Sequence, residues 1–253
     1  MPGIVTEELT KKYGTTSAVN ELSLSIPAGE IYGFLGPNGA GKTTTMRMLT
    51  GLLKPTSGSA RVANVDITNR DDLRGRIGYL PEEPPIYEHA TAYEQLEYIA
   101  GLRDLPSDTM GERIDTLLED LDLTDDASKR MSEYSKGMRQ KVAYIQAVMH
   151  QPDVIFLDEP TAGLDPRASR TIRTKIRDLA GTGTTVFLST HILPVVEEVA
   201  DTIGILHRGE LIVEDSPDVL TNFAETGKTR ALEDVFLELT TSEHVPSNHE
   251  RDN

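Results

Sequence analysis

The sequence contains no cysteine and no tryptophan, and only 5% of its residues are aromatic. Without cysteine there is no disulfide framework, no thiol nucleophile and no thiolate metal site. Long apolar runs are absent too, because the most apolar stretches, Val154–Leu157 and Val186–Leu188, are far shorter than the roughly 18 residues that a membrane-spanning helix needs. The N-terminal residues also lack the apolar core of a signal peptide. We therefore expect a cytoplasmic protein that reaches a membrane only through another chain.

Basic residues are scarce. The 253 residues include 25 Lys and Arg against 41 Asp and Glu, which gives a formal net charge of −16. Nucleic acids and anionic lipid surfaces bind clustered Lys and Arg, so this balance argues against both as direct partners. The acid excess has two interpretations, adaptation to a high-salt cytoplasm or ordinary solubility through self-repulsion. The sequence leaves both open.

Strand-like and helical patterns alternate along the chain. Short apolar runs predict strands at Ile31–Leu35, Ile77–Leu80, Val154–Leu157, Val186–Leu188, Ile203–Leu206 and Leu211–Val213. Helical spacing predicts helices at Thr43–Thr50, Tyr93–Leu102, Met110–Leu121, Gly137–Met149, Ala168–Ala180 and Ala231–Leu239. The pattern predicts an α/β core at about 1–87 and 151–215, interrupted by a helical subdomain at about 88–150. A C-terminal helical stretch at about 216–240 and a disordered tail, 241–253, would follow.

A glycine-rich segment directly follows the predicted strand Ile31–Leu35 and precedes a predicted helix. It fits the pattern G-x-x-x-x-G-K-[ST], in which backbone N–H groups surround a phosphate at a helix N-terminus. Lys42 would reach the β- and γ-phosphates of ATP, and the Thr43 hydroxyl would bind Mg²⁺. An ordinary glycine-rich turn is the alternative, but the strand and the helix favour a nucleotide loop. Its predicted nucleotide-binding residues are Gly36, Pro37, Asn38, Gly39, Ala40, Gly41, Lys42, Thr43 and Thr44.

Two carboxylates, Asp158 and Glu159, stand at the end of the apolar run Val154–Leu157. Asp158 would support Mg²⁺, directly or through water, and Glu159 would polarise the water that attacks the γ-phosphate. An acidic pair at a strand end is often only a solvated turn. Together with the phosphate loop, it indicates a P-loop nucleotide hydrolase. Kinases, GTPases and helicases are still possible at this point.

Further motifs narrow the choice. The run YSKGM at residues 134–138 resembles the LSGGQ signature of the ABC ATPases, with Ser135 and Gly137 at matching positions. Gly163-Leu164-Asp165 follows the acidic strand as the D-loop of that family does, and His191 follows the next strand as its switch histidine does. Tyr13 resembles the aromatic residue on which adenine stacks. Ser135 could instead be a plain helix cap, and Tyr13 could pack at a sheet edge. The order of the motifs favours the family resemblance, which covers roughly residues 4–240.

The resemblance implies a RecA-like P-loop NTPase core with an antiparallel β subdomain and an inserted α-helical subdomain. It also implies an ATPase whose catalytic residues are Glu159, His191 and Lys42, and whose Ser135 and Gly137 bind the nucleotide of a second copy. The expected partners are a second ATPase subunit, in a homodimer or a heterodimer with a related subunit, and an integral membrane permease. The protein would then be peripheral on the inner face of the cell membrane.

The chain ending and the run YSKGMRQ resemble ATPase subunits of bacterial and archaeal exporters of drugs, lipids or polysaccharides, which favours export over import. A soluble ABC ATPase acting on ribosomes or DNA is the main alternative. Such ATPases usually carry two cassettes in one chain and bind nucleic acid through basic surfaces, whereas this chain has one cassette and a strongly negative charge. A module that binds ATP without turnover is a third possibility, weakened by the presence of Glu159 and His191.

One position departs from the family pattern. Where the family usually has glutamine after the strand Ile77–Leu80, this sequence has Glu82. A carboxylate can still ligate Mg²⁺, so we expect Thr43, Asp158 and Glu82 as the metal ligands. An ionised carboxylate cannot donate a hydrogen bond, so the departure affects how this loop would sense the γ-phosphate. The alternative is a plain exposed turn.

Overall fold

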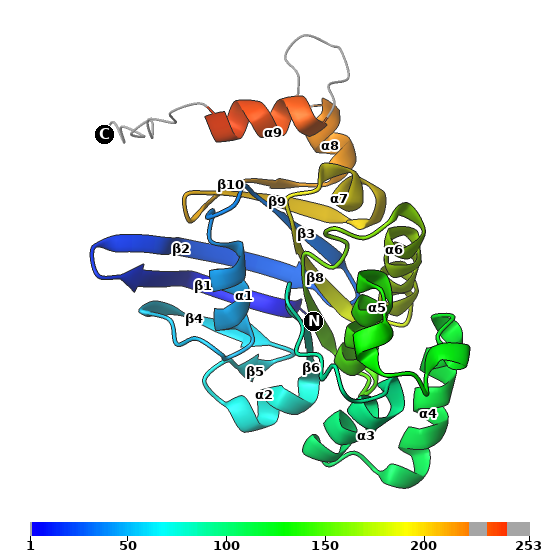
Figure 1. Cartoon of the computed structure of the whole chain (residues 1–253). Coiled ribbons are helices and arrows are strands. Elements are labelled where there is room, and N and C mark those ends of the chain that lie inside the picture. Colours follow the sequence, from blue (N-terminus) through cyan, green and yellow to red (C-terminus); the bar gives the residue numbers. More distant parts are fainter. Residues whose placement is uncertain (1, 223–231, 242–253) are drawn as a thin grey trace, which may run out of the picture.

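A six-stranded, mostly parallel sheet forms the centre of the computed structural model, which describes residues 2–222 and 232–241 (Figure 1). Its strand order is β10-β9-β3-β8-β7-β6, and only the β9–β10 pair is antiparallel. The strands are β3 (Ile31–Leu35), β6 (Ile77–Leu80), β7 (Val154–Asp158), β8 (Thr185–Thr190), β9 (Thr202–His207) and β10 (Glu210–Asp215). β3, β7 and β8 are buried along their whole lengths. Their near-continuous apolar sequences are typical of a parallel sheet covered on both faces.

A second, antiparallel sheet lies beside the first, with strand order β2-β1-β4-β5 (Figure 1). It contains β1 (Pro2–Tyr13), β2 (Thr16–Pro27), β4 (Ser57–Val62) and β5 (Val65–Asp66). Helix α1 (Lys42–Leu49) lies between the two sheets, because it contacts β2 and β4 on one side and β7 on the other. The core around α1 includes Met46 and the clustered rings of Phe34, Phe156 and Phe187.

The other helices form a second apolar core, apart from the one around α1, or lie at the periphery of the molecule. They are α2 (Arg70–Arg76), α3 (Ala92–Leu102), α4 (Ser107–Asp120), α5 (Lys136–Val148), α6 (Pro166–Gly181), α7 (Leu193–Val199), α8 (Pro217–Asn222) and α9 (Leu232–Thr241), with 3₁₀ turns η1 (Thr124–Asp126) and η2 (Met131–Glu133). In Figure 1, α3, α4 and α5 gather at one end of the molecule. α5 also packs on β6, so a single apolar core continues from this helical end into the sheet.

Local sequence explains where several helices begin and end. Thr91 starts α3 with a capping box, in which its side chain accepts from the Glu94 backbone and the Glu94 carboxylate accepts from the Thr91 backbone. Asp165 caps α6, and its carboxylate accepts from two backbone N–H groups of the first turn. Gly51 ends α1 in the left-handed region, with a φ of 71°, as its position after the helical pattern predicts.

The predicted fold class is confirmed, including the antiparallel sheet and the helices inserted between strands of the core. Each predicted strand and helix overlaps an observed one, with ends shifted by a few residues. Ala231, predicted as the start of the last helix, lies outside the described residues. The predicted tail was wrong at Thr241, which is the last residue of α9, and residues 242–253 lie outside the described part. None of the described helices has the length and apolar character that crossing a bilayer requires.

Candidate active site

The carboxyl ends of three neighbouring parallel strands meet at one edge of the central sheet. Leu35 at the end of β3 pairs with Thr190 at the end of β8, and Asp158 at the end of β7 pairs with Ser189. The glycine-rich loop follows β3, Glu159 follows β7 and His191 follows β8. Ligands of open α/β sheets bind at this edge. The register therefore brings together residues that lie more than a hundred positions apart in the sequence.

The glycine-rich loop turns sharply into α1. Ala40 donates its backbone N–H to the Pro37 carbonyl (3.1 Å), and Thr45 donates to Gly41 (2.9 Å). Gly41 has a φ of 111°, and a Cβ there would collide with the backbone carbonyl of Ala18. Glycine is required at this position for both reasons. The loop thus leaves the N-terminal N–H groups of α1 open toward an anion.

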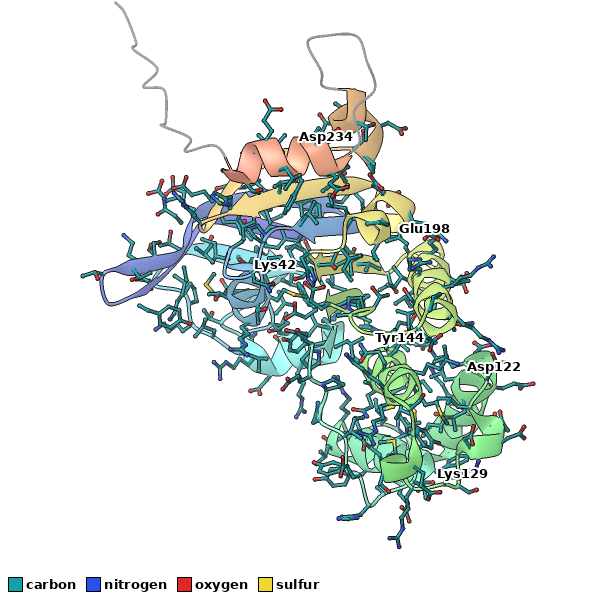
Figure 2. All side chains as sticks on the ribbon, turned by 45° about the horizontal axis from the view of Figure 1, so that its top comes forward. Lys42, Asp122, Lys129, Tyr144, Glu198 and Asp234 are labelled. Carbon is teal, nitrogen blue, oxygen red and sulfur yellow. The ribbon has the colours of Figure 1, made fainter. Side chains whose placement is uncertain are left out.

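Lys42 is buried and folds back over this loop. Its ammonium donates to the carbonyl of Gly36 (2.7 Å) and to that of Pro37 (3.2 Å). Burial lowers the pKa of Lys42, an effect opposed by the neighbouring carboxylates Glu159, Asp158 and Glu82. Figure 2 places Lys42 within the packed side chains, whereas Lys129 lies at the far end of the helical region. The two carbonyls therefore hold the Lys42 ammonium at the loop, and phosphate oxygens can replace them as its hydrogen-bond acceptors.

Asp158 lies at the bottom of the same edge, almost fully buried. One carboxylate oxygen accepts from the Ser189 hydroxyl (2.9 Å), and the other accepts from the Thr43 hydroxyl (3.0 Å). Burial raises the pKa of Asp158, although both hydroxyl hydrogen bonds lower it. Hydroxyl and carboxylate oxygens are the ligand types that Mg²⁺ prefers. The donor set of Thr43 and Asp158 thus fits this ion.

Glu159 is held from three sides. Its Oε1 lies 2.7 Å from Nδ1 of His191, and its Oε2 accepts from the Thr190 hydroxyl (2.8 Å). Oε1 is also 4.0 Å from the ammonium of Lys42. The side chain is 6% exposed, whereas that of His191 is 48% exposed. The backbone at Glu159 is in the left-handed region, with a φ of 49°, which costs about 1–3 kcal/mol for a non-glycine residue. Such strain is common at functional sites.

These groups surround a pocket of about 360 Å³, a volume within the usual range for small-molecule sites. Its lining includes Glu82, which the sequence singled out as the unusual residue of its loop. The full lining is Ala18, Asn38, Gly39, Gly41, Lys42, Thr43, Thr44, Glu82, Asp158, Glu159 and His191. Six predicted nucleotide-binding residues are not part of this lining: Gly36, Pro37 and Ala40, which belong to the same glycine-rich loop, and the more distant Tyr13, Ser135 and Gly137.

Ser135 and Gly137 lie elsewhere, at the start of α5. Ser135 caps this helix, and its hydroxyl accepts from the Met138 N–H (3.2 Å). Gly137 packs tightly against α6, because a Cβ there would lie 3.0 Å from the Cβ of Ala168. Tyr13 ends β1 with 54% of its side chain exposed, and the Lys11 ammonium lies 5.2 Å from its ring centroid. These residues are therefore separate from the pocket within one chain.

Three further residues contribute to the site, and sequence reasoning did not identify them. Ser189 and Thr190 orient the two carboxylates, and Ala18 lines the pocket from β2. The available signal was the polar ending of an otherwise apolar strand, directly before His191. Hydroxyls at the end of a buried parallel strand must find partners, and the neighbouring strand end carries Asp158 and Glu159.

Comparisons with known proteins agree with this geometry. A family model described as ABC transporter matches residues 19–162. The bacitracin transport ATP-binding protein BcrA of Enterococcus faecalis is 42% identical over 213 residues, which cover 83% of this chain and 68% of that protein. The daunorubicin resistance ATP-binding protein DrrA3 of Streptomyces coeruleorubidus is 38% identical over 92% of this chain and 73% of its own length.

Solved structures give the same result. An ATP-binding subunit of an ABC transporter superposes with a TM-score of 0.84 at 29% identity, covering 93% of this chain and 98% of that one. A dimeric ATP-binding cassette in a post-hydrolysis state, bound to ADP and Pi, gives a TM-score of 0.76 at 26% identity, covering 84% and 98%. The family match and the relatives agree with the arrangement of the phosphate loop, the two carboxylates and the histidine. This chain therefore belongs to the ABC transporter family, as an ATP-binding subunit.

Proposed function

We propose that this subunit hydrolyses ATP and couples the hydrolysis to export by a separate membrane-spanning permease. The observation that carries the proposal is the environment of Glu159. Its carboxylate is buried beside the phosphate loop, hydrogen-bonded to His191 and Thr190, and 4.0 Å from the Lys42 ammonium. A carboxylate fixed in this way can accept a proton from, or polarise, a water aimed at the γ-phosphate.

The other site residues would bind and orient the substrate. On ATP binding, the Lys42 ammonium exchanges the carbonyls of Gly36 and Pro37 for the β- and γ-phosphate oxygens. His191 keeps Nδ1 on Glu159 and has Nε2 for the γ-phosphate. Thr43 and Asp158 would hold Mg²⁺, with Glu82 at the pocket wall, and the ion would supply charge neutralisation at the phosphates. A kinase would also need a site for an acceptor substrate, and nothing in the pocket lining suggests one.

A complete site would require a second copy of the chain. Ser135 presents the N-terminus of α5 outside the pocket, where it can act as an anion site for a neighbouring subunit. A two-fold dimer places two such helix ends opposite two phosphate loops, so that each ATP lies between the copies. Tyr13 at the end of β1 would stack on adenine. The dimeric cassette with bound ADP and Pi supports this arrangement by analogy. A related ATPase subunit could replace the second copy.

A groove between α2 and the end of α3 is the surface we propose for the permease. Its lining combines the exposed Leu52 with Ile77, Tyr79 and three arginines, Arg70, Arg74 and Arg103. Burial lowers the pKa of Arg103, and the neighbouring positive charge of Arg74 lowers it further, while Arg74 also lies 3.9 Å from the carboxylate of the exposed Asp104. In a chain with a net charge of −16, such a basic and apolar groove suits a short amphipathic permease segment with an acidic side chain.

The experiment is co-expression with a candidate polytopic membrane protein, followed by co-purification and ATPase measurement. We expect the subunit to co-purify in an Mg²⁺-dependent, ATP-hydrolysing complex located at the inner face of the cell membrane. The double substitution Arg74→Glu, Arg103→Glu should weaken co-purification, whereas Arg61→Glu on β4 should not. Hydrolysis without any membrane partner, together with co-purifying RNA or DNA, would contradict the transport role. The export direction draws on the relatives named for bacitracin transport and daunorubicin resistance.

A further inference from the structure

Helix α5 and the turn after β7 are joined by a buried side-chain hydrogen bond. Nε2 of Gln140, in the second turn of α5, donates to the carbonyl oxygen of Pro160 at 3.1 Å. Gln140 is only 6% exposed. Pro160 directly follows Glu159, so the hydrogen bond ends one residue beyond the proposed catalytic carboxylate. Most buried polar side-chain groups have a hydrogen-bond partner, and the Pro160 carbonyl is the partner of this amide.

The contact continues along both segments. Gly137 packs on the first turn of α6, where a Cβ would lie 3.0 Å from the Cβ of Ala168 and 3.7 Å from Oδ2 of Asp165. The Lys136 ammonium lies over Gly163 so closely that a Cβ there would collide with it. The start of α5 and residues 160–168 therefore form one packed unit. Close packing of this kind transmits small displacements, because neither side can move without the other.

The turn that Gln140 contacts is held in an unfavourable conformation. The backbone at Glu159 has a φ of 49°, in the region that non-glycine residues seldom adopt. Its N–H is fixed by the Ser189 carbonyl at 2.8 Å, and its carbonyl accepts from Ala162 at 3.1 Å. Pro160 has no N–H to contribute, so its carbonyl oxygen is the group available for an anchor on this side. The Gln140 amide occupies it, and thus fixes the Pro160–Thr161 peptide, which lies one residue beyond Glu159.

We propose that Gln140 is a positioning residue that links the signature end of α5 to Glu159 in the same chain. The inference rests on the proposed function, in which Ser135 serves the ATP held mainly by the partner copy and Glu159 serves its own chain's ATP. Any displacement of α5 when Ser135 engages a γ-phosphate is carried through Gln140 to Pro160 and to the carboxylate beside it. Gln140 thereby makes turnover at one site depend on occupancy of the other, which is a coupling between two sites.

The test compares Gln140→Met with Gln146→Met on the same helix. Methionine keeps the length of glutamine and removes the amide. The amide nitrogen of Gln146 is buried without a hydrogen-bond partner within the described ranges 2–222 and 232–241, so its replacement removes no such anchor. The measurements on the full-length dimer are thermal midpoint, affinity for ATP, kcat, KM and the Hill coefficient for ATP hydrolysis.

We expect Gln140→Met to bind ATP as the wild type does, while kcat falls by about tenfold to a hundredfold, as misplacement of a reacting group does. Its Hill coefficient should fall toward one, and Gln146→Met should keep the wild-type values. An unchanged kcat in folded Gln140→Met would overturn the inference. A parallel loss of ATP affinity and kcat would also overturn it, because it would indicate a merely structural role.

Gln140→Glu covers the case in which the methionine variant does not fold. An ionised glutamate cannot donate to Pro160, but its protonated carboxyl can, and burial favours protonation. The activity of Gln140→Glu relative to wild type should therefore rise as the pH falls, and a flat ratio in a folded protein would refute the inference. If the wild type itself does not hydrolyse Mg-ATP, the proposed function fails and this inference with it. If the wild type is active and neither Gln140 variant differs from it, only this inference fails.

Discussion

Replacing Glu159 with glutamine removes one negative charge and keeps the shape of the side chain. The amide oxygen can accept from the Thr190 hydroxyl, and the amide N–H₂ can donate to Nδ1 of His191, so both observed hydrogen bonds can be kept; only the 4.0 Å charge contact with the Lys42 ammonium is lost. Each such buried hydrogen bond contributes about 0.5–1.5 kcal/mol. Because neither is lost, the free energy of unfolding should change little. ATP affinity should also be retained, because Lys42 and the phosphate loop are unaltered.

Turnover should respond very differently. An amide is a far weaker base than a carboxylate, and general-base contributions amount to about 10²–10⁴ in rate, or about 3–5 kcal/mol of activation free energy. The assay is phosphate release under saturating Mg-ATP, with ATP binding and a thermal melt measured on the same sample. Glu197→Gln, an exposed position on α7, is the matched control and should keep normal turnover. A near-normal kcat for Glu159→Gln would remove Glu159 from the mechanism, and loss of ATP binding would show that the change disrupted the site.

Three further outcomes follow from the site and its surroundings. Tyr13→Ala should weaken ATP binding by about 1–3 kcal/mol, as loss of a base-stacking ring does, whereas Tyr13→Phe should bind normally in a titration calorimeter; equal affinity of both variants would count against stacking. Gly78→Ala should destabilise the protein by about 1–3 kcal/mol, because its Cβ would collide with the Ala147 carbonyl of α5; an unchanged denaturation midpoint would contradict the close approach of β6 and α5. Asp158→Asn should raise the thermal midpoint of the nucleotide-free protein at neutral pH. Burial raises the pKa of Asp158 in the folded state, so the folded state binds more protons than the unfolded one and loses stability as the pH rises through that window. The gain from asparagine should therefore vanish in melts at acid pH, below the pKa of the unfolded carboxyl, and a gain independent of pH would refute this cause.

The central strands could be predicted because each is a short apolar run that is followed by a polar residue, glycine or proline. β3, β7 and β8 are buried on both faces, so their sequences carry an unbroken apolar signal. β1 and β2 were not predicted as individual strands. Their pairing contains several register shifts, and Glu8 and Glu21 adopt positive φ values of 48° and 45°. Such irregularities break the two-residue alternation on which strand prediction depends.

Some residues of the site could likewise be predicted from the sequence, and others could not. Lys42, Asp158, Glu159 and His191 were predicted because their motifs are contiguous and stand at strand ends. Their grouping in one pocket follows from the parallel register. Contacts that depend on how separate elements pack could not be predicted from residue type.

Thr190 and Gln140 are examples of such contacts. The hydrogen bond from Thr190 to Glu159 depends on the pairing of β7 with β8, and that from Gln140 to Pro160 depends on how α5 lies against the turn. For Ser135, the family resemblance rather than its residue type implied a role at the nucleotide of a second copy. The structure places it outside the lining of the pocket of its own chain.

Mixing two inactive variants tests the proposed shared site most directly. In a Lys42→Ala dimer both sites lack the lysine, and in a Ser135→Ala dimer both lack the serine. A mixed dimer combines the intact Lys42 of one chain with the intact Ser135 of the other, so one complete site reappears. The measurement is ATP-dependent dimerisation and ATP hydrolysis after the two variants have exchanged subunits. Recovery of dimerisation or hydrolysis in the mixture, relative to either variant alone, is the predicted result. If subunit exchange is demonstrated and neither signal recovers, the site is not shared between two copies.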